Sequence, residues 1–529
     1  MQRPLGAQIS HMLKDRGVEV IFGIPGVHNQ EMYRGIEEAG LTHVLARHEQ
    51  GAGFMADGYA RATGRPGVAY VITGPGLCNI MTPMGQAYSD SVPMLVISSC
   101  LDETSATRGQ LHQMKDQEGA ARTVCDWSET ARTPQAAYAL IDRALTEFRH
   151  GRARPKHIQV PIAVLEAMAD PFPGTQPMGF VTAPEFAASD FEAVLNAERP
   201  LFIFGGGARA CGYVAKDVLK ALNAAAFDTY AGRGVSTGSA LSFGAYLARP
   251  GSRDVIAQAD VVVLVGTELA ETDLWREDAG ITGTCLSVNI DASGFHPQAM
   301  RHVHGDAFDY LTQLLSAAAQ HRPKGQWLAK DIAAQKRRWR TEVETERPGL
   351  GPVIKALRAA LHDRVMIYSD MTQIAYAAKE IWPMKHPGFW HHPTGFGTLG
   401  YALPAAIGGA IARRGRGRND PLNPVLAIAG DYGFQYTLQE LAVAVELELT
   451  LPIILWDNGK LGEIEDSMVR AQIAPHAVVQ KNPDFVKLAE AYGAAAARPK
   501  SVEELASAVD KAFYATRPTL IHVQNDIAI

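Results

Sequence analysis

The 529-residue chain has little that would place it in a membrane or an oxidising compartment. Its five cysteines are scattered, without a Cys-x-x-Cys pair or a pairing rhythm, which argues for reduced thiols and against a disulfide framework. No apolar run approaches the length that spans a bilayer, and the first residues lack the apolar stretch of a signal peptide. We therefore expect a cytoplasmic protein without a membrane partner.

Charge of one sign is also not concentrated anywhere. The net charge is −6, and the two short basic stretches, 336–340 and 413–418, are expected to be solvated faces or loops rather than a track for nucleic acid. Apolar residues make up 47% of the chain and charged residues 20%, which is typical of a globular protein with a sizeable core. The length suggests about three domains.

Strand and helix patterns alternate along the whole chain, in three segments at about 1–168, 186–320 and 350–529. This alternation predicts an α/β fold with three doubly wound parallel sheets. A link rich in proline and glycine at 170–177 separates the first two segments, and a charged helix is expected at 326–346. The expected strands are 18–23, 68–72, 94–98, 156–161, 201–207, 261–266, 425–429 and 452–456.

Two polar residues follow buried strands in the third segment. Asp431 comes after the run 425–429 and Asn458 after the run 452–456, with a helical pattern at 437–445 between them. In such a strand–helix–strand unit both side chains reach the carboxyl edge of a parallel sheet. Oxygen ligands there suit Mg²⁺, and N–H groups near Gly433 can bind phosphate. An ordinary turn in which Asp431 caps a helix is the alternative.

These residues, Gly430–Gly433 and Asp457–Lys460, resemble the metal–diphosphate motif of thiamine diphosphate (ThDP) enzymes. The resemblance implies ThDP and Mg²⁺ as cofactors, with Asp431, Asn458 and the backbone carbonyl of Lys460 as metal ligands. One departure is visible, because Asp457 stands where the family has the first of two asparagines.

A second stretch, 47–61, is similar to the helix that carries the catalytic glutamate of the same family. The resemblance implies that Glu49 hydrogen-bonds the aminopyrimidine ring and so promotes formation of the reactive ylid. The alternative is that Glu49 only favours the positive end of its helix.

A third stretch, 394–408, is similar to the loop and helix that bend the cofactor. The resemblance implies that Leu399 lies under the bent cofactor and that the carbonyl of Gly397 accepts a hydrogen bond from it. The Ala/Gly run after Pro404 is expected to form a tightly packed helix. The cofactor-binding residues implied by the family pattern are Pro25, Asn79, Thr372, Gln373, Gly397, Leu399, Gly430, Tyr432, Gly433 and Glu463.

The family resemblance also implies an assembly. In relatives the glutamate and the metal site belong to neighbouring subunits, so a homodimer or homotetramer with active sites at the dimer interface is expected. Acetohydroxyacid synthases bind FAD in the middle domain, but their usual loop is replaced here by 266–273. The glycines at 205–207 do not match a dinucleotide fingerprint, so we expect a middle domain without FAD and disfavour a nucleotide-dependent oxidoreductase.

The expected reaction begins with addition of the ylid to a 2-oxo acid, followed by loss of CO₂. His28, His112 and Gln117 are candidates to line the catalytic pocket, because relatives use a histidine at or near His28 for proton transfer and acetohydroxyacid synthases have a glutamine near the substrate at Gln117. The alternative is that these loop histidines are only exposed to solvent. Protonation of the resulting enamine would release an aldehyde. Attack on a second carbonyl compound, as in acetolactate synthases, would instead make a new carbon–carbon bond.

The segment after the metal motif bears on the substrate. Glu463 and Asp466 are three residues apart and share one helix face, which would suit a cationic tail such as a guanidinium. The run resembles 2-ketoarginine (5-guanidino-2-oxopentanoate) decarboxylases. The alternative is a solvent-facing acidic helix start.

The leading hypothesis is thus a ThDP- and Mg²⁺-dependent, non-oxidative 2-oxo acid decarboxylase that acts on a cationic small-molecule substrate. An acetolactate synthase-like carboligase is the second hypothesis. A non-catalytic ThDP-binding protein is the third, and the presence of Glu49 argues against it.

Overall fold

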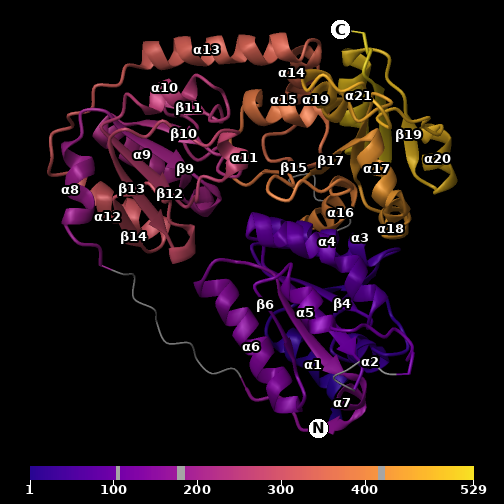
Figure 1. Cartoon of the computed structure of the whole chain (residues 1–529). Helices are drawn as coiled ribbons and strands as arrows, with labels where there is room; N and C mark the ends of the chain where they lie inside the picture. Colours follow the sequence, from indigo (N-terminus) through magenta and orange to yellow (C-terminus); the bar gives the residue numbers. More distant parts are fainter. Residues whose placement is uncertain (103–107, 175–184, 415–422, 529) are drawn as a thin grey trace. The chain divides into compact units, whose positions relative to one another are not determined.

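The computed structural model describes residues 1–102, 108–174, 185–414 and 423–528 (Figure 1). It contains three six-stranded parallel sheets flanked by helices, which confirms the predicted α/β fold class. The chain divides into two compact units: the first comprises 1–178, 365–373 and 395–528, and the second 179–364 and 374–394. The first unit therefore combines the N-terminal segment with most of the C-terminal one. The predicted boundaries of the three domains remain predictions.

The N-terminal sheet has the strand order β3-β2-β4-β5-β7-β6, and every neighbouring pair is parallel. Its core strand β5 is buried along its whole length. A short antiparallel pair, β1 (Arg3–Pro4) with β8 (Met168–Ala169), was not predicted. The remaining elements are β2 (Val20–Gly23), β3 (Thr42–Leu45), β4 (Gly67–Val71), β5 (Met94–Cys100), β6 (Trp127–Thr130) and β7 (Lys156–Pro161), with α1 (Leu5–Asp15), α2 (Gln30–Glu38), α3 (Glu49–Thr63), α4 (Pro75–Asp90), α5 (Gln117–Arg122), α6 (Pro134–His150) and α7 (Ile162–Glu166).

The C-terminal sheet, as far as it lies in the first unit, has the order β15-β17-β18-β20-β19. Its first two strands are neighbours although a long connection separates them, so the chain reverses its winding there and leaves their carboxyl ends as a binding edge. The elements are β15 (Met366–Ser369), β17 (Val425–Gly430), β18 (Pro452–Asp457), β19 (Ala495–Ala497) and β20 (Thr519–Gln524), with α16 (Ala402–Arg413), α17 (Asp431–Thr437), α18 (Leu441–Glu446), α19 (Gly462–Arg470), α20 (Phe485–Ala491) and α21 (Val502–Ala512).

The single helix predicted at 437–445 is wrong in detail. Helix α17 ends at Thr437, a 3₁₀ turn covers Leu438–Glu440, and α18 follows. The interruption has a physical cause, because the Thr437 hydroxyl donates a 2.8 Å hydrogen bond to the Gly400 carbonyl. The side chain of Glu440 is fully buried at the same turn.

Helices α3 and α16 pack closely within the first unit, as the Ala/Gly pattern after Pro404 predicted. A Cβ atom on Gly58 would lie 1.9 Å from the Ala405 carbonyl oxygen, and one on Gly408 would lie 1.9 Å from that of Met55. Only glycine allows the two backbones to approach this closely. The glutamate-bearing helix α3 is therefore fixed against the helix that follows the Leu399 loop (Figure 1).

The second unit contains the middle sheet, with the order β11-β10-β9-β12-β13-β14. Its elements are β9 (Pro200–Phe204), β10 (Ala225–Asp228), β11 (Ser242–Gly244), β12 (Val261–Val265), β13 (Thr284–Asn289) and β14 (Arg301–His304), with α8 (Ser189–Asn196), α9 (Gly212–Leu222), α10 (Ser252–Ile256), α11 (Glu271–Leu274), α12 (Ala307–Ala318), α13 (Ala329–Glu346), α14 (Leu350–Ala360) and most of α15 (Gln373–Ile381).

The glycines at the carboxyl ends of β9 and β12 pack against each other. A Cβ atom on Gly205 would lie 2.3 Å from the Gly266 carbonyl oxygen, and the Gly207 N–H donates to that same oxygen at 3.0 Å. These glycines thus serve close backbone packing at the point where a nucleotide would enter an open α/β sheet. The expectation that this domain binds no FAD stays a prediction.

The basic stretch 336–340 is not a solvated face throughout, contrary to the prediction. Trp339 is fully buried in α13, and the Lys336 ammonium donates to the Ser242 carbonyl at 3.0 Å. Arg338 and Arg340 do face solvent, each paired with a glutamate one helical turn further on. Residues 415–418 of the second basic stretch and 175–177 of the predicted link lie outside the described residues. No described helix has both the length and the apolar character that a membrane crossing requires.

Candidate active site

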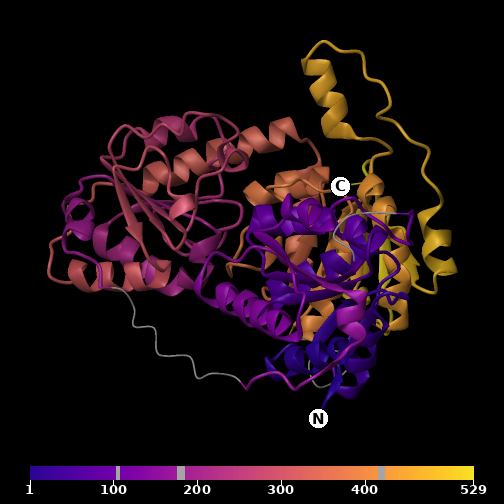
Figure 2. The same cartoon turned by 60° about the horizontal axis from the view of Figure 1, so that its bottom comes forward.

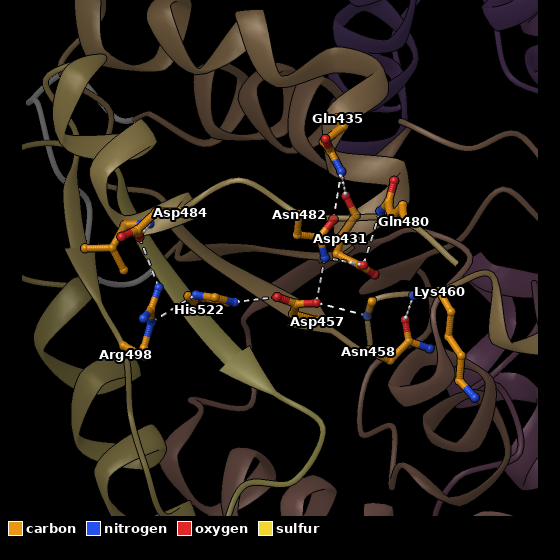
Figure 3. A network of polar contacts seen from close by, with 12 residues as sticks. Asp431, Gln435, Asp457, Asn458, Lys460, Gln480, Asn482, Asp484, Arg498 and His522 are labelled. Atoms are coloured by element: carbon orange, nitrogen blue, oxygen red, sulfur yellow. Dashed lines mark hydrogen bonds and ion pairs between the residues drawn. The ribbon is translucent and has the colours of Figure 1, made fainter. Parts of the chain in front are cut away.

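Asp431 lies where β17 ends and α17 begins, and its residue surface is only 2% exposed (Figure 3). Its Oδ2 accepts hydrogen bonds from the side-chain amides of Asn482 at 2.7 Å and Gln480 at 3.3 Å. Burial raises the pKa of this carboxyl, and these two bonds only partly offset the effect. Asp431 thus projects a buried, oriented carboxylate at the sheet edge.

Asn458 and Lys460 follow the neighbouring strand β18 in a tight turn. The Asn458 Oδ1 accepts a 3.3 Å hydrogen bond from the Lys460 N–H, and Gly459 between them has a φ of +67°. A left-handed conformation of this kind favours glycine. The Lys460 ammonium pairs with Glu465.

This donor set fits a divalent cation. Among the described residues, no Lys, Arg or His side chain forms an ion pair with Asp431, so its buried negative charge lacks a cationic partner. The described residues also contain no cluster of three or more His, Cys, Asp or Glu side chains that could hold a metal. One carboxylate, one amide and one backbone carbonyl suit Mg²⁺, which keeps positions for water and phosphate. Ligation by Asp431, Asn458 and Lys460 remains a prediction.

Asp370, which the sequence reasoning missed, fixes the loops beside this edge. Its carboxylate is 1% exposed and accepts hydrogen bonds from the Met371 N–H at 2.9 Å and the Gly400 N–H at 2.8 Å. Burial raises its pKa to about 6, although these N–H groups act in the opposite direction. A Cβ atom on Gly433 would lie 2.4 Å from its Oδ2. Asp370 therefore bonds the Leu399 loop and lies directly against the start of α17.

Most predicted cofactor residues of this domain gather at the same edge. A Cβ atom on Gly430 would lie 3.5 Å from the Thr372 side chain, and the Gln373 Oε1 accepts a 3.3 Å bond from the Trp456 indole. Tyr432 is half-buried in the first turn of α17.

The predicted cofactor-bending loop packs on α4 of the same unit. Thr398 donates to Gln86 at 3.1 Å, while Leu399 is half-buried and Gly397 is exposed with a φ of +68°. An apolar side chain is thus held at the rim of the sheet.

Glu49 opens α3 and is buried, with 8% of its surface exposed. His48 caps the helix by accepting the Gln50 N–H at 3.1 Å. The Glu49 Oε2 accepts a 2.9 Å hydrogen bond from the Asn79 amide, so a predicted catalytic residue meets a predicted cofactor residue. A Cβ atom on Gly76 would lie 3.4 Å from the other carboxylate oxygen, which shows how closely the start of α4 approaches.

Glu440 is a second carboxylate that the sequence reasoning missed. It is fully buried, and its two oxygens accept hydrogen bonds from the Arg47 N–H at 3.2 and 3.0 Å. The His48 N–H also donates to it. Burial raises the pKa of Glu440 to about 7, and the negative charge of Glu49 adds to the rise. Its only sequence signal was an acid within the apolar pattern between the two halves of the metal motif.

The structure brings the two predicted histidines together. The ring centroids of His28 and His112 are 4.9 Å apart in an edge-to-face arrangement. Burial lowers the pKa of His28, and His112 lowers it further, while Asp102 and Glu166 act in the opposite direction. The Nδ1 atoms of both rings are buried without a hydrogen-bond partner among the described residues. Pro25, in the preceding loop, is exposed.

The side-chain amide of Gln117 is already hydrogen-bonded within the protein. Its Oε1 accepts the Gly74 N–H at 2.9 Å, and its Nε2 donates to the Ser99 carbonyl at 2.8 Å and to Ser98 at 3.2 Å. It therefore ties the ends of β4 and β5 together. A cavity of about 220 Å³ adjoins it, lined also by Thr73, Cys100 and Gln159.

The acidic pair at Glu463 and Asp466 lies on α19, which extends outward in Figure 2. Glu463 is half-buried and Asp466 is exposed. The same segment exposes the apolar side chains of Ile464, Val469 and Ile473. Within the described chain, these acids do not form a buried pocket like that around Asp431.

Three family models match the chain in order along its sequence. The N-terminal TPP binding domain of thiamine pyrophosphate enzymes matches residues 3–120, the central domain 190–314 and the C-terminal TPP binding domain 370–523. Together with a full-length relative at 40% identity, described next, these matches establish that the chain belongs to the thiamine pyrophosphate enzymes. The resemblance inferred from Glu49, Asp431 and Asn458 is confirmed at the level of the family.

Among curated proteins, the chain is similar to a probable 2-ketoarginine decarboxylase, AruI, of Pseudomonas aeruginosa, with 40% identity over 99% of this chain and 94% of the relative. The large subunit of acetolactate synthase isozyme 3 of Escherichia coli is 28% identical over 98% of this chain and 93% of its own length. The mitochondrial acetolactate synthase catalytic subunit of Saccharomyces cerevisiae is 29% identical over 98% of this chain and 80% of its own length.

Proposed function

We propose that the protein is a ThDP- and Mg²⁺-dependent decarboxylase of 2-oxo acids, with 2-ketoarginine as its leading substrate. The observation that carries the proposal is the hydrogen bond between the half-buried Asn79 and the buried Glu49, which joins a predicted cofactor residue to a predicted catalytic residue. The 40% identity to a probable 2-ketoarginine decarboxylase supports the substrate class.

The proposed roles belong to residues that follow strands of two sheets, the N-terminal and the C-terminal one. ThDP, when bound, supplies a reactive thiazolium carbon and an electron sink for the loss of CO₂. Asp431, Asn458 and the Lys460 carbonyl would hold Mg²⁺, while the first N–H groups of α17 would bind phosphate oxygens. Glu49 would hold a proton at a ring nitrogen of the aminopyrimidine, in a dry setting that strengthens the hydrogen bond.

His28 and His112 are proposed to control protonation of the product. Burial and the neighbouring ring lower the pKa of His28 and favour its neutral imidazole, so His28 would accept a proton and pass it on rather than hold it. Gln117 would shape the pocket by holding the ends of β4 and β5, since its amide is already hydrogen-bonded. Protonation would release an aldehyde, 4-guanidinobutanal in the case of 2-ketoarginine.

The proposed protein is a cytoplasmic homodimer or homotetramer. As in the family pattern, Glu49 of one subunit would serve the metal site of a partner. Such an arrangement would also cover the exposed apolar side chains on α19. Glu463 and Asp466 would then face the substrate rather than solvent.

The test is a product assay. The purified protein with ThDP and Mg²⁺ is given 2-ketoarginine or pyruvate in separate reactions, and CO₂ and products are measured by mass spectrometry. CO₂ with 4-guanidinobutanal from 2-ketoarginine supports the proposal.

Acetolactate from pyruvate, with 2-ketoarginine inert, would instead support the carboligase that the acetolactate synthase relatives make the second candidate. ThDP binding without turnover of either compound would favour the non-catalytic alternative.

A further inference from the structure

Asp457 is the position at which this chain departs from the family's pair of asparagines. The structure gives its carboxylate a partner on the adjacent strand, because the Asp457 Oδ2 lies 2.8 Å from the Nε2 of His522 in β20 (Figure 3). His522 is buried, with 3% of its surface exposed. The substitution of a carboxylate for an amide is thus matched by a histidine far along the sequence.

Arg498 decides which nitrogen of His522 carries the proton. The Arg498 Nε–H lies 3.2 Å from the His522 Nδ1, and an arginine nitrogen can only donate. The Nδ1 must therefore accept, which places the ring proton on Nε2, where it is donated to Asp457. Asp484 holds the guanidinium from the other side at 3.0 Å.

The other oxygen of Asp457 forms hydrogen bonds within the metal motif. The Asp457 Oδ1 accepts the Gly459 N–H at 3.0 Å, within the turn that carries Asn458 and Lys460. It also accepts the Asn482 amide at 2.8 Å, and the same amide nitrogen donates to the Asp431 Oδ2 at 2.7 Å. The Asp457 carboxylate thus accepts hydrogen bonds from the turn that carries Asn458 and Lys460, and from Asn482, which also bonds Asp431.

An asparagine at this position would conflict with these neighbours. Its amide nitrogen would face either the His522 Nε2–H, or the Gly459 N–H and the Asn482 amide, all of which are donors. The imidazole cannot turn into an acceptor at Nε2 while Arg498 donates to its Nδ1. Asp457, His522 and Arg498 therefore form one hydrogen-bonded unit in which each residue specifies the next.

We propose that His522, oriented by Arg498, is a positioning residue of the metal site: through Asp457 it sets the geometry of Asp431, Asn458 and Lys460. This inference rests on the proposed Mg²⁺ site. Residues that hydrogen-bond a metal ligand typically change metal affinity about 10–100-fold when they are removed. His522 acts through Asp457, one hydrogen bond further from the ligands, so the lower end of this range is expected.

The test measures Mg²⁺ affinity of the full-length protein with ThDP present, by isothermal titration calorimetry and without substrate. His522→Ala and Asp457→Asn are each expected to weaken Mg²⁺ binding about tenfold or more. The double variant should lose no more than the worse single variant, because both changes break the same unit. His150→Ala, an exposed histidine at the end of α6, is the matched control and should bind as the wild type does.

A second pair of substitutions tests which nitrogen of His522 carries the proton. Adding Arg498→Met to Asp457→Asn frees the His522 Nδ1 to carry the proton. Its Nε2 can then accept from the amide introduced by Asp457→Asn, and Mg²⁺ affinity should partly recover. This pair avoids truncating the buried imidazole and keeps the test valid if His522→Ala does not fold.

The results distinguish a failure of the proposed Mg²⁺ site from a failure of the role assigned to His522. A wild-type protein that binds no Mg²⁺ with ThDP overturns the metal site itself. Normal wild-type binding with unchanged single variants, or with additive losses in the double variant, overturns only the role of His522.

Discussion

Two groups of acidic side chains stand in contrast within the first unit. Asp431, Asp370, Glu440 and Glu49 are buried at strand or helix ends, and each accepts specific hydrogen bonds from backbone or amide N–H groups. The acids of α19 are half-buried or exposed on a segment that extends outward. The fold thus specifies partners for the first group before any ligand binds. The second group depends on what later covers it.

The difference has an energetic reason. A buried carboxylate without partners is costly, so its surroundings must supply donors or a cation, and these fix its position. An exposed acid interacts weakly because water screens it. The buried group is therefore suited to catalysis and metal binding, while the exposed group suits recognition that is completed by a partner subunit or a substrate.

The largest effect is expected from Glu49→Gln. The amide cannot exchange a proton with the cofactor, so kcat should fall roughly 10²–10⁴-fold, the usual contribution of a positioned acid–base group. The measurement is the steady-state rate of CO₂ release from 2-ketoarginine.

Circular dichroism and Mg²⁺ titration with ThDP serve as controls for the Glu49 variant, and both should match the wild type. Full retained activity would contradict the catalytic role of Glu49 and the proposed mechanism.

An intermediate effect is expected from Glu440→Gln, which should change how the free energy of unfolding depends on pH. The folded chain raises the pKa of Glu440 from 4.5 to about 7, so between these values the folded state keeps a proton that the unfolded chain has released. Its stabilising contribution is complete below about pH 4.5 and is lost as pH rises through 7. This loss is on the order of 3 kcal/mol of unfolding free energy, and the variant should lack it.

Urea unfolding of the apoprotein at pH 5, 6 and 8 tests this, read as the difference between wild type and variant. Glu446→Gln is the control, because Glu446 pairs with Arg47 at the surface with 57% of its side chain exposed. Equal pH dependence in wild type and Glu440→Gln would contradict the burial argument.

The smallest effects are expected on α19. Glu463→Gln should raise KM for 2-ketoarginine about tenfold, the scale of one charge-assisted hydrogen bond. It should leave KM unchanged for a 2-oxo acid whose side chain is uncharged. Asp466→Asn should change KM less than Glu463→Gln does, since Asp466 is exposed. Substrate selectivity that is identical in both variants and the wild type would identify the pair as a solvated helix start.

Local sequence patterns predicted much of this architecture. Apolar runs located β17 and β18 nearly to the residue, and an apolar run followed by small residues located Glu49 at the start of α3. They failed at 437–445, where Thr437 and Glu440 form long-range contacts that interrupt the helix. They failed also at Trp339, whose basic neighbours concealed a core residue.

The sequence by itself determined the alternation of strands and helices and the family, and it singled out Glu49, Asp431 and Asn458 as candidate site residues, because apolar periodicity and motif spacing are local features. Only the tertiary structure decided which groups Asp370, Glu440 and His522 bond. Their partners are residues distant in the chain, namely Gly400, Arg47 and Asp457. Burial and hydrogen bonding between such residues arise when the sheets and helices pack, and no local pattern carries that information.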